Sequence, residues 1–209
     1  MDVTTAFLQS RPIRRDVYLK PPSAAGEEEG KVWKLNVTVY GLADAQREWH
    51  QTVSTFLKTI NGVSLVRDQA VFLWYTKSEL FGFLATHVDD FLWAGDDGFE
   101  EHVVARLRRR FPIGEEARAD FHYVGVHVRC EHGENGYLEE ILVDQEDFVD
   151  DLELLSENKD VKQETVLNSA EHTAYRGAVG SFLWASSTTM PDLAFDVALL
   201  SGATSSQTM

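Results

Sequence analysis

The chain has almost no cysteine and no long apolar run, and both absences limit what it can be. Its single cysteine, Cys130, excludes an internal disulfide and suits a reducing interior. No apolar run approaches the roughly 18 residues of a membrane span, and the first residues lack the basic start and apolar stretch of a secretory signal. With 209 residues, 44% of them hydrophobic, the chain is expected to be an intracellular, cytoplasmic globular protein without membrane contact.

Positive charge is also scarce. The chain has 19 Lys and Arg against 34 Asp and Glu, a net charge of −15, whereas a free-standing nucleic-acid binder usually carries a basic face. The deficit is uneven, because residues 131–171 contain 14 acidic and 2 basic residues, while residues 1–130 contain 18 acidic and 16 basic ones. The first part could therefore present a local positive groove, and the acidic later part argues against nucleic acid lying there.

Several familiar chemical motifs are missing. There is no Gly-rich phosphate loop and no Ser-His-Asp ordering. His122, His127 and His132 repeat every five residues, which is not a zinc pattern with cysteines. We expect His122 and His127 on opposite faces of one strand, as solvated or core histidines. A basic cluster ends a predicted helix, where a structural role is favoured over phosphate contact by about two to one; its members are Arg106, Arg108, Arg109 and Arg110.

The spacing of apolar residues predicts the elements of the first part. Apolar residues recur at three- and four-residue steps from Ala45 to Ile60, which predicts a helix. Asp97 is expected to cap a second helix, which buries Phe99, Val103, Leu107 and Phe111. Segments 3–8 and 16–19 are expected to be short strand-like or irregular pieces. Strands are expected at 31–39, 69–75, 80–88 and 91–94. The last two would form a hairpin with Asp89-Asp90 at its tip.

The later part is predicted to contain a second hairpin followed by helices. Segments 121–130 and 137–143 flank the turn formers of 131–136. A short helix is expected over 148–155, another over 175–185, and a last one opened by Pro191. Strands and helices mix without a regular βαβ alternation, so the predicted fold class is α+β rather than a doubly wound sheet.

The tip of the first hairpin carries the strongest chemical signal. Two adjacent carboxylates, Asp89 and Asp90, oppose each other's ionisation, and a divalent cation would relieve this. Asp2 is the candidate third carboxylate of a two-metal site. On spacing alone, a polar type I′ turn on a surface hairpin is the better reading by roughly three chances in four, since aspartate is a common turn former.

Five segments in order resemble the reverse transcriptases of copia-type retrotransposons. MDVTTAFL is similar to the segment that holds their first catalytic aspartate, and THVDDFLWAG to their YVDD hairpin. VWKLNVTVYGLADAQREWH is similar to their segment leading to YGL and an aromatic helix, and FHYVGVHV with LEEILVDQEDFVDDLELL to their LG hairpin and following helix. TAYRGAVGSFLWASSTTMPDLAFDVALLS is similar to their C-terminal block. The ordered set covers nearly the whole chain.

This resemblance implies roles for particular residues. Asp2 and Asp89 would hold two Mg²⁺ ions, with Mn²⁺ as an alternative, and Asp90 would assist. The implied nucleotide-binding residues are Phe7, as a gate against a 2′-hydroxyl, Gly41, near the templating base pair, and Val88. The implied primer contacts are His87, Val124 and Gly125. The partners would be an RNA or DNA template-primer and deoxynucleotides, and the setting would be a virus-like particle.

The same resemblance implies a palm-like antiparallel sheet backed by helices, a following hairpin and a helical C-terminal segment. Residues 1–130 would form the palm-like core with the catalytic hairpin. Residues 131–209 would supply the hairpin return strand, an acidic helix and thumb- or connection-like helices. His87 stands where the family usually has tyrosine, and Gln46 where it has proline.

The fingers segment that precedes the first aspartate in the family is largely missing. We expect it to come from an upstream segment, or from another part of the polyprotein. Three hypotheses therefore remain: a truncated reverse transcriptase domain, a non-catalytic remnant co-opted for protein interactions, and a fragment that needs another chain.

Overall fold

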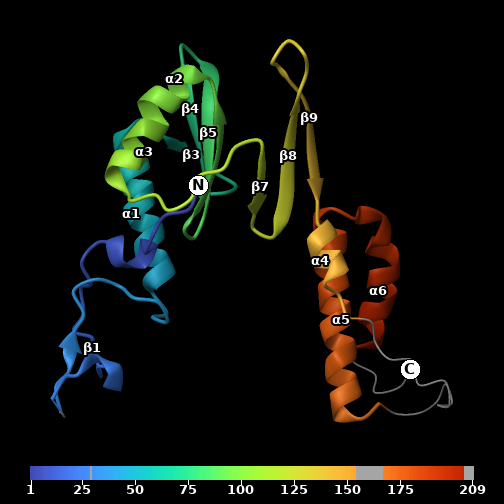
Figure 1. Ribbon diagram of the computed structural model, residues 1–209, viewed down its shortest axis with the longest axis horizontal. Helices are drawn as coiled ribbons and strands as arrows, with labels where there is room; N and C mark the ends of the chain where they lie inside the picture. Colours follow the sequence, from blue (N-terminus) through green and yellow to red (C-terminus); the bar gives the residue numbers. More distant parts are fainter. Residues whose placement is uncertain (29, 154–166, 205–209) are drawn as a thin grey trace. The chain divides into compact units, whose positions relative to one another are not determined.

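The computed structural model describes residues 1–28, 30–153 and 167–204. They form two compact units, Met1–Ala117 and Arg118–Met209. Antiparallel sheets and helices make up both, so the predicted α+β class is confirmed (Figure 1). The second unit begins before Cys130. Cys130 lies inside strand β8 (Val126–His132), which pairs with strands on both sides and stays with them in the second unit.

The first unit is built on a four-stranded antiparallel sheet in the order β3-β4-β5-β6. Its strands are β3 (Val63–Ser64), β4 (Val71–Thr76), β5 (Glu79–His87) and β6 (Asp90–Gly95). Its helices are α1 (Ala45–Thr59), α2 (Asp97–Phe99), a π-helical turn (Glu100–Val104) and α3 (Ala105–Arg110). The predicted hairpin at 80–94 and the predicted helix from Ala45 are confirmed.

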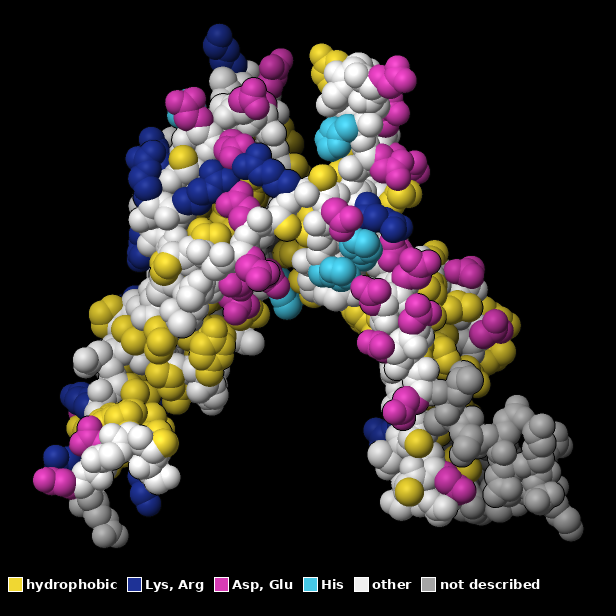
Figure 2. All heavy atoms as spheres, in the orientation of Figure 1, with side chains coloured by type: hydrophobic (Ala, Val, Ile, Leu, Met, Phe, Trp, Pro, Cys, Tyr) yellow, Lys and Arg dark blue, Asp and Glu magenta, His cyan; other side chains and the backbone are white. Residues whose placement is uncertain are grey.

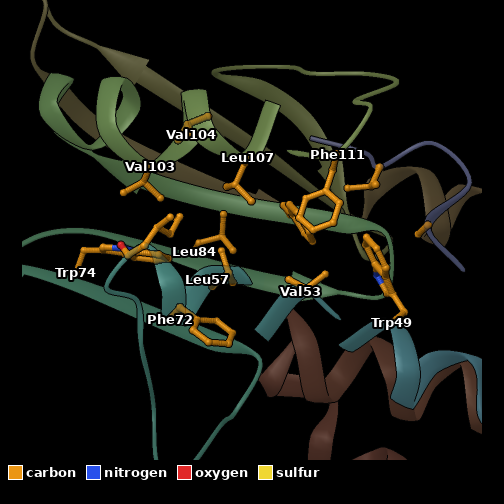
Figure 3. Packing of buried hydrophobic residues seen from close by; sticks show 14 of the residues in the cluster. Trp49, Val53, Leu57, Phe72, Trp74, Leu84, Val103, Val104, Leu107 and Phe111 are labelled. Carbon is orange, nitrogen blue, oxygen red and sulfur yellow. The ribbon is translucent and has the colours of Figure 1, made fainter. Parts of the chain in front are cut away.

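Aromatic and aliphatic side chains from helices and sheet fill one core (Figure 3). The helix faces predicted from spacing are buried, through Trp49, Val53 and Leu57 on α1, and through Phe99, Val103, Leu107 and Phe111 on the second helical segment. Full burial of each such side chain contributes roughly 1.5–3 kcal/mol. The cap of the second segment is Asp96 rather than Asp97, because the Asp96 carboxylate accepts the Phe99 N–H at 2.8 Å.

Two strand-like segments of the first unit form little strand, so the predicted strand over 31–39 is mostly wrong. In segment 3–8 only Val3 joins a β-bridge, and Ala6–Gln9 forms a 3-10 helix after Thr5 turns the chain at a φ of 52°. In segment 31–39 only β2 (Trp33–Lys34) pairs, with the short β1 (Tyr18–Leu19). After β2 the chain is no longer in a strand and makes a buried polar contact instead. The Thr38 hydroxyl donates to the Phe7 carbonyl at 3.0 Å.

The second unit combines a three-stranded antiparallel sheet with helices. Its strands are β7 (Asp120–Tyr123), β8 (Val126–His132) and β9 (Leu138–Asp144). Its helices are α4 (Glu146–Asp150), α5 (Ser169–Thr188), a 3-10 turn (Pro191–Leu193) and α6 (Ala194–Ala203). Helix α5 begins earlier than predicted because Asn168 and Glu171 form a capping box. Part of the helix expected over 148–155 lies outside the described residues. No helix in the described ranges has the length and apolar character that a membrane crossing requires.

The two histidines expected on opposite strand faces instead lie side by side. The predicted strand 121–130 is folded into a hairpin, so His122 on β7 pairs across from His127 on β8. Their rings stack with centroids 4.6 Å apart. The Asp147 carboxylate accepts a hydrogen bond from His122 at 3.0 Å. The Asp120 carboxylate accepts one from His127 at 2.7 Å. The hydrogen bond from His127 lowers the pKa of the exposed Asp120 carboxyl.

Charge is distributed unevenly over the surface. On the face shown in Figure 2, Lys and Arg side chains gather over α3 in the first unit, and Asp and Glu predominate on the second unit. Within the basic cluster, Arg108 has a structural partner, because its guanidinium bonds Glu116 and lies 3.1 Å from Glu100.

The turn between β7 and β8 is strained at one residue. Val124 and Gly125 form a two-residue loop with φ values of 51° and 73°, and positive φ at both central positions defines a type I′ turn. A β-branched residue rarely adopts this conformation, and holding it costs about 1–3 kcal/mol.

We predict that Val124→Asn raises the unfolding free energy by about 1 kcal/mol, because Asn-Gly is the preferred type I′ pair. Denaturant unfolding of the full chain measures the change. Val66→Asn is the matched control, since Val66 is almost fully exposed and has no positive φ. An unchanged or lower value for Val124→Asn, relative to this control, would contradict the strain argument.

Candidate active site

The tip of the β5–β6 hairpin is a strained two-residue turn. His87 and Asp90 form the last strand pair, which leaves Val88 and Asp89 as the loop. Val88 has a φ of 53°, and Asp89 is not among the residues with positive φ. A type I′ turn needs positive φ at both positions, so the predicted type I′ turn is wrong and the pattern matches type II′. The strain at Val88, about 1–3 kcal/mol, must be balanced by contacts nearby.

Helix α1 supplies the contact that holds this turn. The Trp49 indole N–H donates to the Val88 carbonyl at 2.5 Å. The Trp49 side chain is only 2% exposed, and its ring meets the edge of the Phe111 ring with centroids 5.2 Å apart. Figure 3 shows Trp49 at one end of the packed cluster, beyond Val53. A rigid core residue therefore fixes the backbone between the two strands.

The first residues of the chain pair with this hairpin. The Val3 N–H donates to the Asp89 carbonyl at 2.9 Å, and the Phe91 N–H donates to the Met1 carbonyl at 2.8 Å. Asp2 thus lies opposite Asp90 in an antiparallel bridge. Because these bonds come from the flanking residues, the pair is of the non-hydrogen-bonded kind, in which facing side chains come closest.

The opposite edge of the same short segment is also paired. The Thr4 N–H donates to the Pro112 carbonyl at 3.0 Å, and the Gly114 N–H donates to the Asp2 carbonyl at 2.9 Å. A Cβ on Gly114 would lie 2.8 Å from Asp2 Oδ2 and 2.9 Å from Thr4 Oγ1. Glycine at this position leaves the space that the Asp2 carboxylate occupies.

The carboxylates at this site act on each other electrostatically. Partial burial, followed by the negative charges of Asp89 and Asp2, raises the pKa of the Asp90 carboxyl. Desolvation and the same two charges raise the pKa of the Tyr40 phenol. Three carboxylates and one phenol therefore share a local negative field, which a cation would relieve.

The donor set fits a hard divalent cation such as Mg²⁺, because all the candidate ligands are carboxylate oxygens. Within the described ranges, however, no group of three or more His, Cys, Asp or Glu side chains is arranged to hold a metal ion. Mg²⁺ usually takes only one or two protein carboxylates and completes its shell with water and substrate phosphates. Asp2, Asp89 and Asp90 could hold it in that manner.

Tyr40 lies beside this site and was not singled out from the sequence. Its ring is 4.6 Å from that of Phe7, and it is 58% exposed, whereas Phe7 is buried in the core. Gly41, the next residue, has a φ of 91°, and a Cβ there would contact nothing within 4 Å. Glycine is thus needed at position 41 for its backbone conformation. The only sequence signal for Tyr40 was its place in the YGL segment, Tyr40 to Leu42.

The implied primer-contact residues fall in different units. His87 is exposed at the end of β5, opposite Asp90. Val124 and Gly125 form the β7–β8 turn of the second unit, where a Cβ on Gly125 would lie 2.9 Å from the Trp184 ring. The structure brings together Asp2, Val88, Asp89 and Asp90 within the first unit.

We predict that Trp49→Phe lowers the unfolding free energy by about 1–2 kcal/mol, because the Val88 carbonyl loses its donor. Backbone amide NMR shifts of Val88, Asp89 and Asp90 are expected to move. The matched control is Trp74→Phe, which removes a similar buried bond, from the Trp74 indole to the Ile60 carbonyl at 2.8 Å. Equal movement of the tip resonances in both variants would contradict a specific role for Trp49.

We also predict that Asp90→Asn stabilises the metal-free protein at neutral pH by a few tenths to about 1 kcal/mol, because like charges opposite each other destabilise a strand pair. A carboxyl whose pKa is raised in the folded state binds its proton more tightly there. Wild-type stability should therefore fall as pH rises through that raised pKa, and the variant should lose this slope.

Unfolding free energies across this pH range test the Asp90 prediction. Asp97→Asn is the control, since it removes an exposed carboxylate from the first turn of a helix, where negative charge is favourable. Destabilisation by Asp90→Asn without metal would show that the three carboxylates do not repel one another.

Comparison with known proteins identifies the family. The family described as "Reverse transcriptase (RNA-dependent DNA polymerase)" matches residues 1–164. The chain is 29% identical, over 59% of its length, to a retrovirus-related Pol polyprotein from transposon RE2 of Arabidopsis thaliana, and 32% identical, over 52%, to that of transposon TNT 1-94 of Nicotiana tabacum. It is 27% identical, over 96% of its length, to a putative transposon Ty5-1 protein of Saccharomyces cerevisiae, of which it covers 68%.

The alignments cover only a small part of the polyproteins. The chain spans 8% of the length of both the RE2 and the TNT 1-94 polyproteins. No solved structure matches it. The family match nevertheless covers most of the chain, and these relatives are Pol polyproteins of copia-type transposons. The chain belongs to the reverse transcriptase family, as a domain of the copia-type retrotransposon branch.

Proposed function

We propose that this domain takes part in template-directed DNA synthesis, by transfer of a nucleotide to a primer 3′-hydroxyl. The observation that carries the proposal is the pairing of Asp2 with Asp90 at a strained hairpin tip, in a family of RNA-dependent DNA polymerases. Strained backbone persists where surrounding structure fixes it, and such positions cluster at active sites. Here the strain lies beside the carboxylates that the chemistry requires.

Asp2 and Asp89 are the proposed ligands of two Mg²⁺ ions, and Asp90 is the proposed assisting carboxylate. When bound, such ions activate the attacking oxygen and stabilise the charge of the leaving pyrophosphate. The protein's own part is to fix these carboxylates before the substrate arrives. The Trp49 bond to Val88 and the space left by Gly114 serve that positioning.

The flanking aromatic residues are proposed to select the nucleotide. Phe7 is the proposed gate against a 2′-hydroxyl, with Val88 and Gly41 beside the nucleotide and the base pair. The exposed Tyr40 ring, packed on Phe7, would present the contact surface, since Phe7 itself is buried. His87, Val124 and Gly125 are the proposed primer contacts.

The wider context is proposed from the family. The first unit would act as the palm, and fingers would come from an upstream segment or another part of the polyprotein. Template-primer and deoxynucleotides would be the partners, inside an intracellular virus-like particle. The net charge of −15 disfavours nucleic-acid binding by this chain alone, so the fingers would supply basic contacts to the template-primer.

A non-catalytic role in protein interaction is the second candidate. Two observations favour it: no group of three metal-binding side chains is arranged within the described ranges, and residues 131–171 are strongly acidic. In that case the carboxylates at the tip would be a solvated turn, and a divalent cation would not bind there saturably.

Primer extension on an RNA template tests the proposal. Purified protein is assayed with Mg²⁺ or Mn²⁺, and Asp89→Asn is the comparison. We expect extension by the wild type and a loss of at least about 100-fold in the variant, because the ligand charge is removed. Asp68→Asn, a carboxylate in a loop of the same unit, is the control and should retain activity.

Metal binding measured without nucleic acid separates the two candidate functions. Saturable Mn²⁺ binding that Asp89→Asn removes would support the proposed site even where extension needs the fingers. A folded wild type with neither extension nor saturable Mn²⁺ binding would leave the interaction role as the better account.

A further inference from the structure

Strand β9 is an edge strand of the three-stranded sheet in the second unit. The strand order is β7-β8-β9, and among the described residues β9 pairs only with β8 (Figure 1). Strand β9 is seven residues long. An edge strand of this length presents a row of backbone N–H and C=O groups with which another extended chain can pair.

The register shows which backbone groups of β9 face outward. The Cys130 N–H donates to the Ala119 carbonyl at 2.6 Å, so the backbone groups of Cys130 point away from β9. Ile141 lies opposite Cys130, and this pair therefore makes no hydrogen bonds between β8 and β9. The N–H and C=O of Ile141 point toward the open edge, and the alternation along a strand gives those of Val143 the same direction.

The side chains of the same two residues are apolar and exposed. Ile141 is 54% exposed and Val143 is 51% exposed. Successive side chains of a strand point to opposite faces, so these two share a face of the sheet with Cys130 and Val128, which lie opposite them on β8 and are half-buried. A strand added to β9 would extend this apolar face by one row and would cover Ile141 and Val143.

The open edge is also acidic. From Glu131 to Glu146 the chain has six acidic residues and no Lys or Arg. Glu139 and Glu140 lie on β9 itself and are exposed. Like charges across a strand pair are destabilising, so a second copy of β9 would be repelled. A strand that carries Lys or Arg would be attracted, and acidic or neutral strands would be disfavoured.

We propose that the β9 edge binds an extended segment of a partner protein in which apolar residues alternate with Lys or Arg. The segment adds a fourth strand: its backbone pairs with Ile141 and Val143, its apolar side chains continue the apolar face, and its cations lie near Glu139 and Glu140. Main-chain hydrogen bonds supply the affinity in this mode of recognition, and the charges select the partner. The proposal goes beyond nucleotide transfer, since the edge belongs to the second unit and holds no candidate metal ligand.

Fluorescence anisotropy with two labelled peptides of about ten residues, the upper range of strand lengths, tests the site on the full chain. One peptide alternates valine with lysine, and the other alternates valine with glutamate. We expect saturable binding of the lysine peptide, and binding of the glutamate peptide weaker by about tenfold or more, because its charges oppose those of β9. Added salt should weaken binding of the lysine peptide.

Ile141→Pro separates strand pairing from general attraction between opposite charges. Proline removes an outward N–H, leaves the hydrogen bonds to β8 in place, and is tolerated on edge strands. Binding of the lysine peptide should fall about fivefold or more, because the added strand loses a backbone hydrogen bond. Ile141→Val is the matched control and should bind as the wild type does, since it keeps the N–H and the apolar face.

Hydrogen exchange of the wild type gives a second readout that needs no substitution. Adding the lysine peptide should slow exchange of the Ile141 and Val143 amides, which point to the open edge. The Leu142 amide should change less, since it already faces β8. Unchanged exchange at Ile141 and Val143 in the bound state would contradict strand addition.

The remaining outcomes are distinct. No saturable binding of the lysine peptide up to about 1 mM would overturn the proposal. Equal binding by the wild type and Ile141→Pro would also overturn it, because charge alone would explain that. Dimerisation of the wild type that Ile141→Pro abolishes would assign the edge to a second copy of the chain instead of the proposed partner. Asp89→Asn should keep peptide binding, which separates this test from that of polymerase activity.

Discussion

The hydrogen bond from the Trp49 indole to the Val88 carbonyl is the interaction on which the hairpin tip depends. It joins helix α1 to a turn whose first residue has an unfavourable φ of 53°. Trp49 is itself held by Phe111, which also contacts Phe56 and Phe91, so one aromatic cluster supports both the helix and the sheet. Because the core fixes the turn, it positions Asp89 and Asp90, and the backbone of Met1 to Val3 pairs alongside them.

The same tip concentrates negative charge that folding alone would not favour. Burial, and then the charges of Asp89 and Asp2, raise the pKa of the Asp90 carboxyl, while other acidic groups in the first unit have cationic partners, as Glu48 has in Arg11 and Asp44 in Arg15. A cluster of carboxylates left in mutual repulsion is a local conflict in an otherwise consistent structure. Such conflicts are expected at functional sites more than elsewhere.

The sequence predicted the parts of the fold that depend on local pattern. The period of Trp49, Val53 and Leu57 predicted a buried helix face, and two apolar runs around Asp89-Asp90 predicted the hairpin. It could not predict that strand 121–130 folds back at Val124-Gly125, because Val-Gly is a poor type I′ signal, and the positions of His122 and His127 were wrong for that reason. At the candidate site the hairpin pattern pointed to Asp89 and Asp90, and the resemblance gave them and Asp2 their implied roles, whereas Tyr40, Trp49 and Gly114 were missed. Their roles depend on contacts between segments far apart in the chain, which spacing does not encode.

The two hairpins show why strain must be interpreted together with its surroundings. Each places a valine at positive φ in the first position of a two-residue turn, Val88 in one and Val124 in the other. After Val124 comes Gly125, which tolerates positive φ and lies against the Trp184 ring, so that turn is a type I′ connection with one poorly suited residue. After Val88 comes Asp89, whose carbonyl accepts a hydrogen bond from the Val3 N–H next to Asp2. The buried Trp49 indole donates to the Val88 carbonyl. The strain is of the same kind in both turns, but at Val88 a buried indole donates a hydrogen bond to the turn carbonyl, and the turn brings Asp90 opposite Asp2. That difference is consistent with the proposed role of the β5–β6 tip, since strained backbone is retained mainly where surrounding contacts fix it.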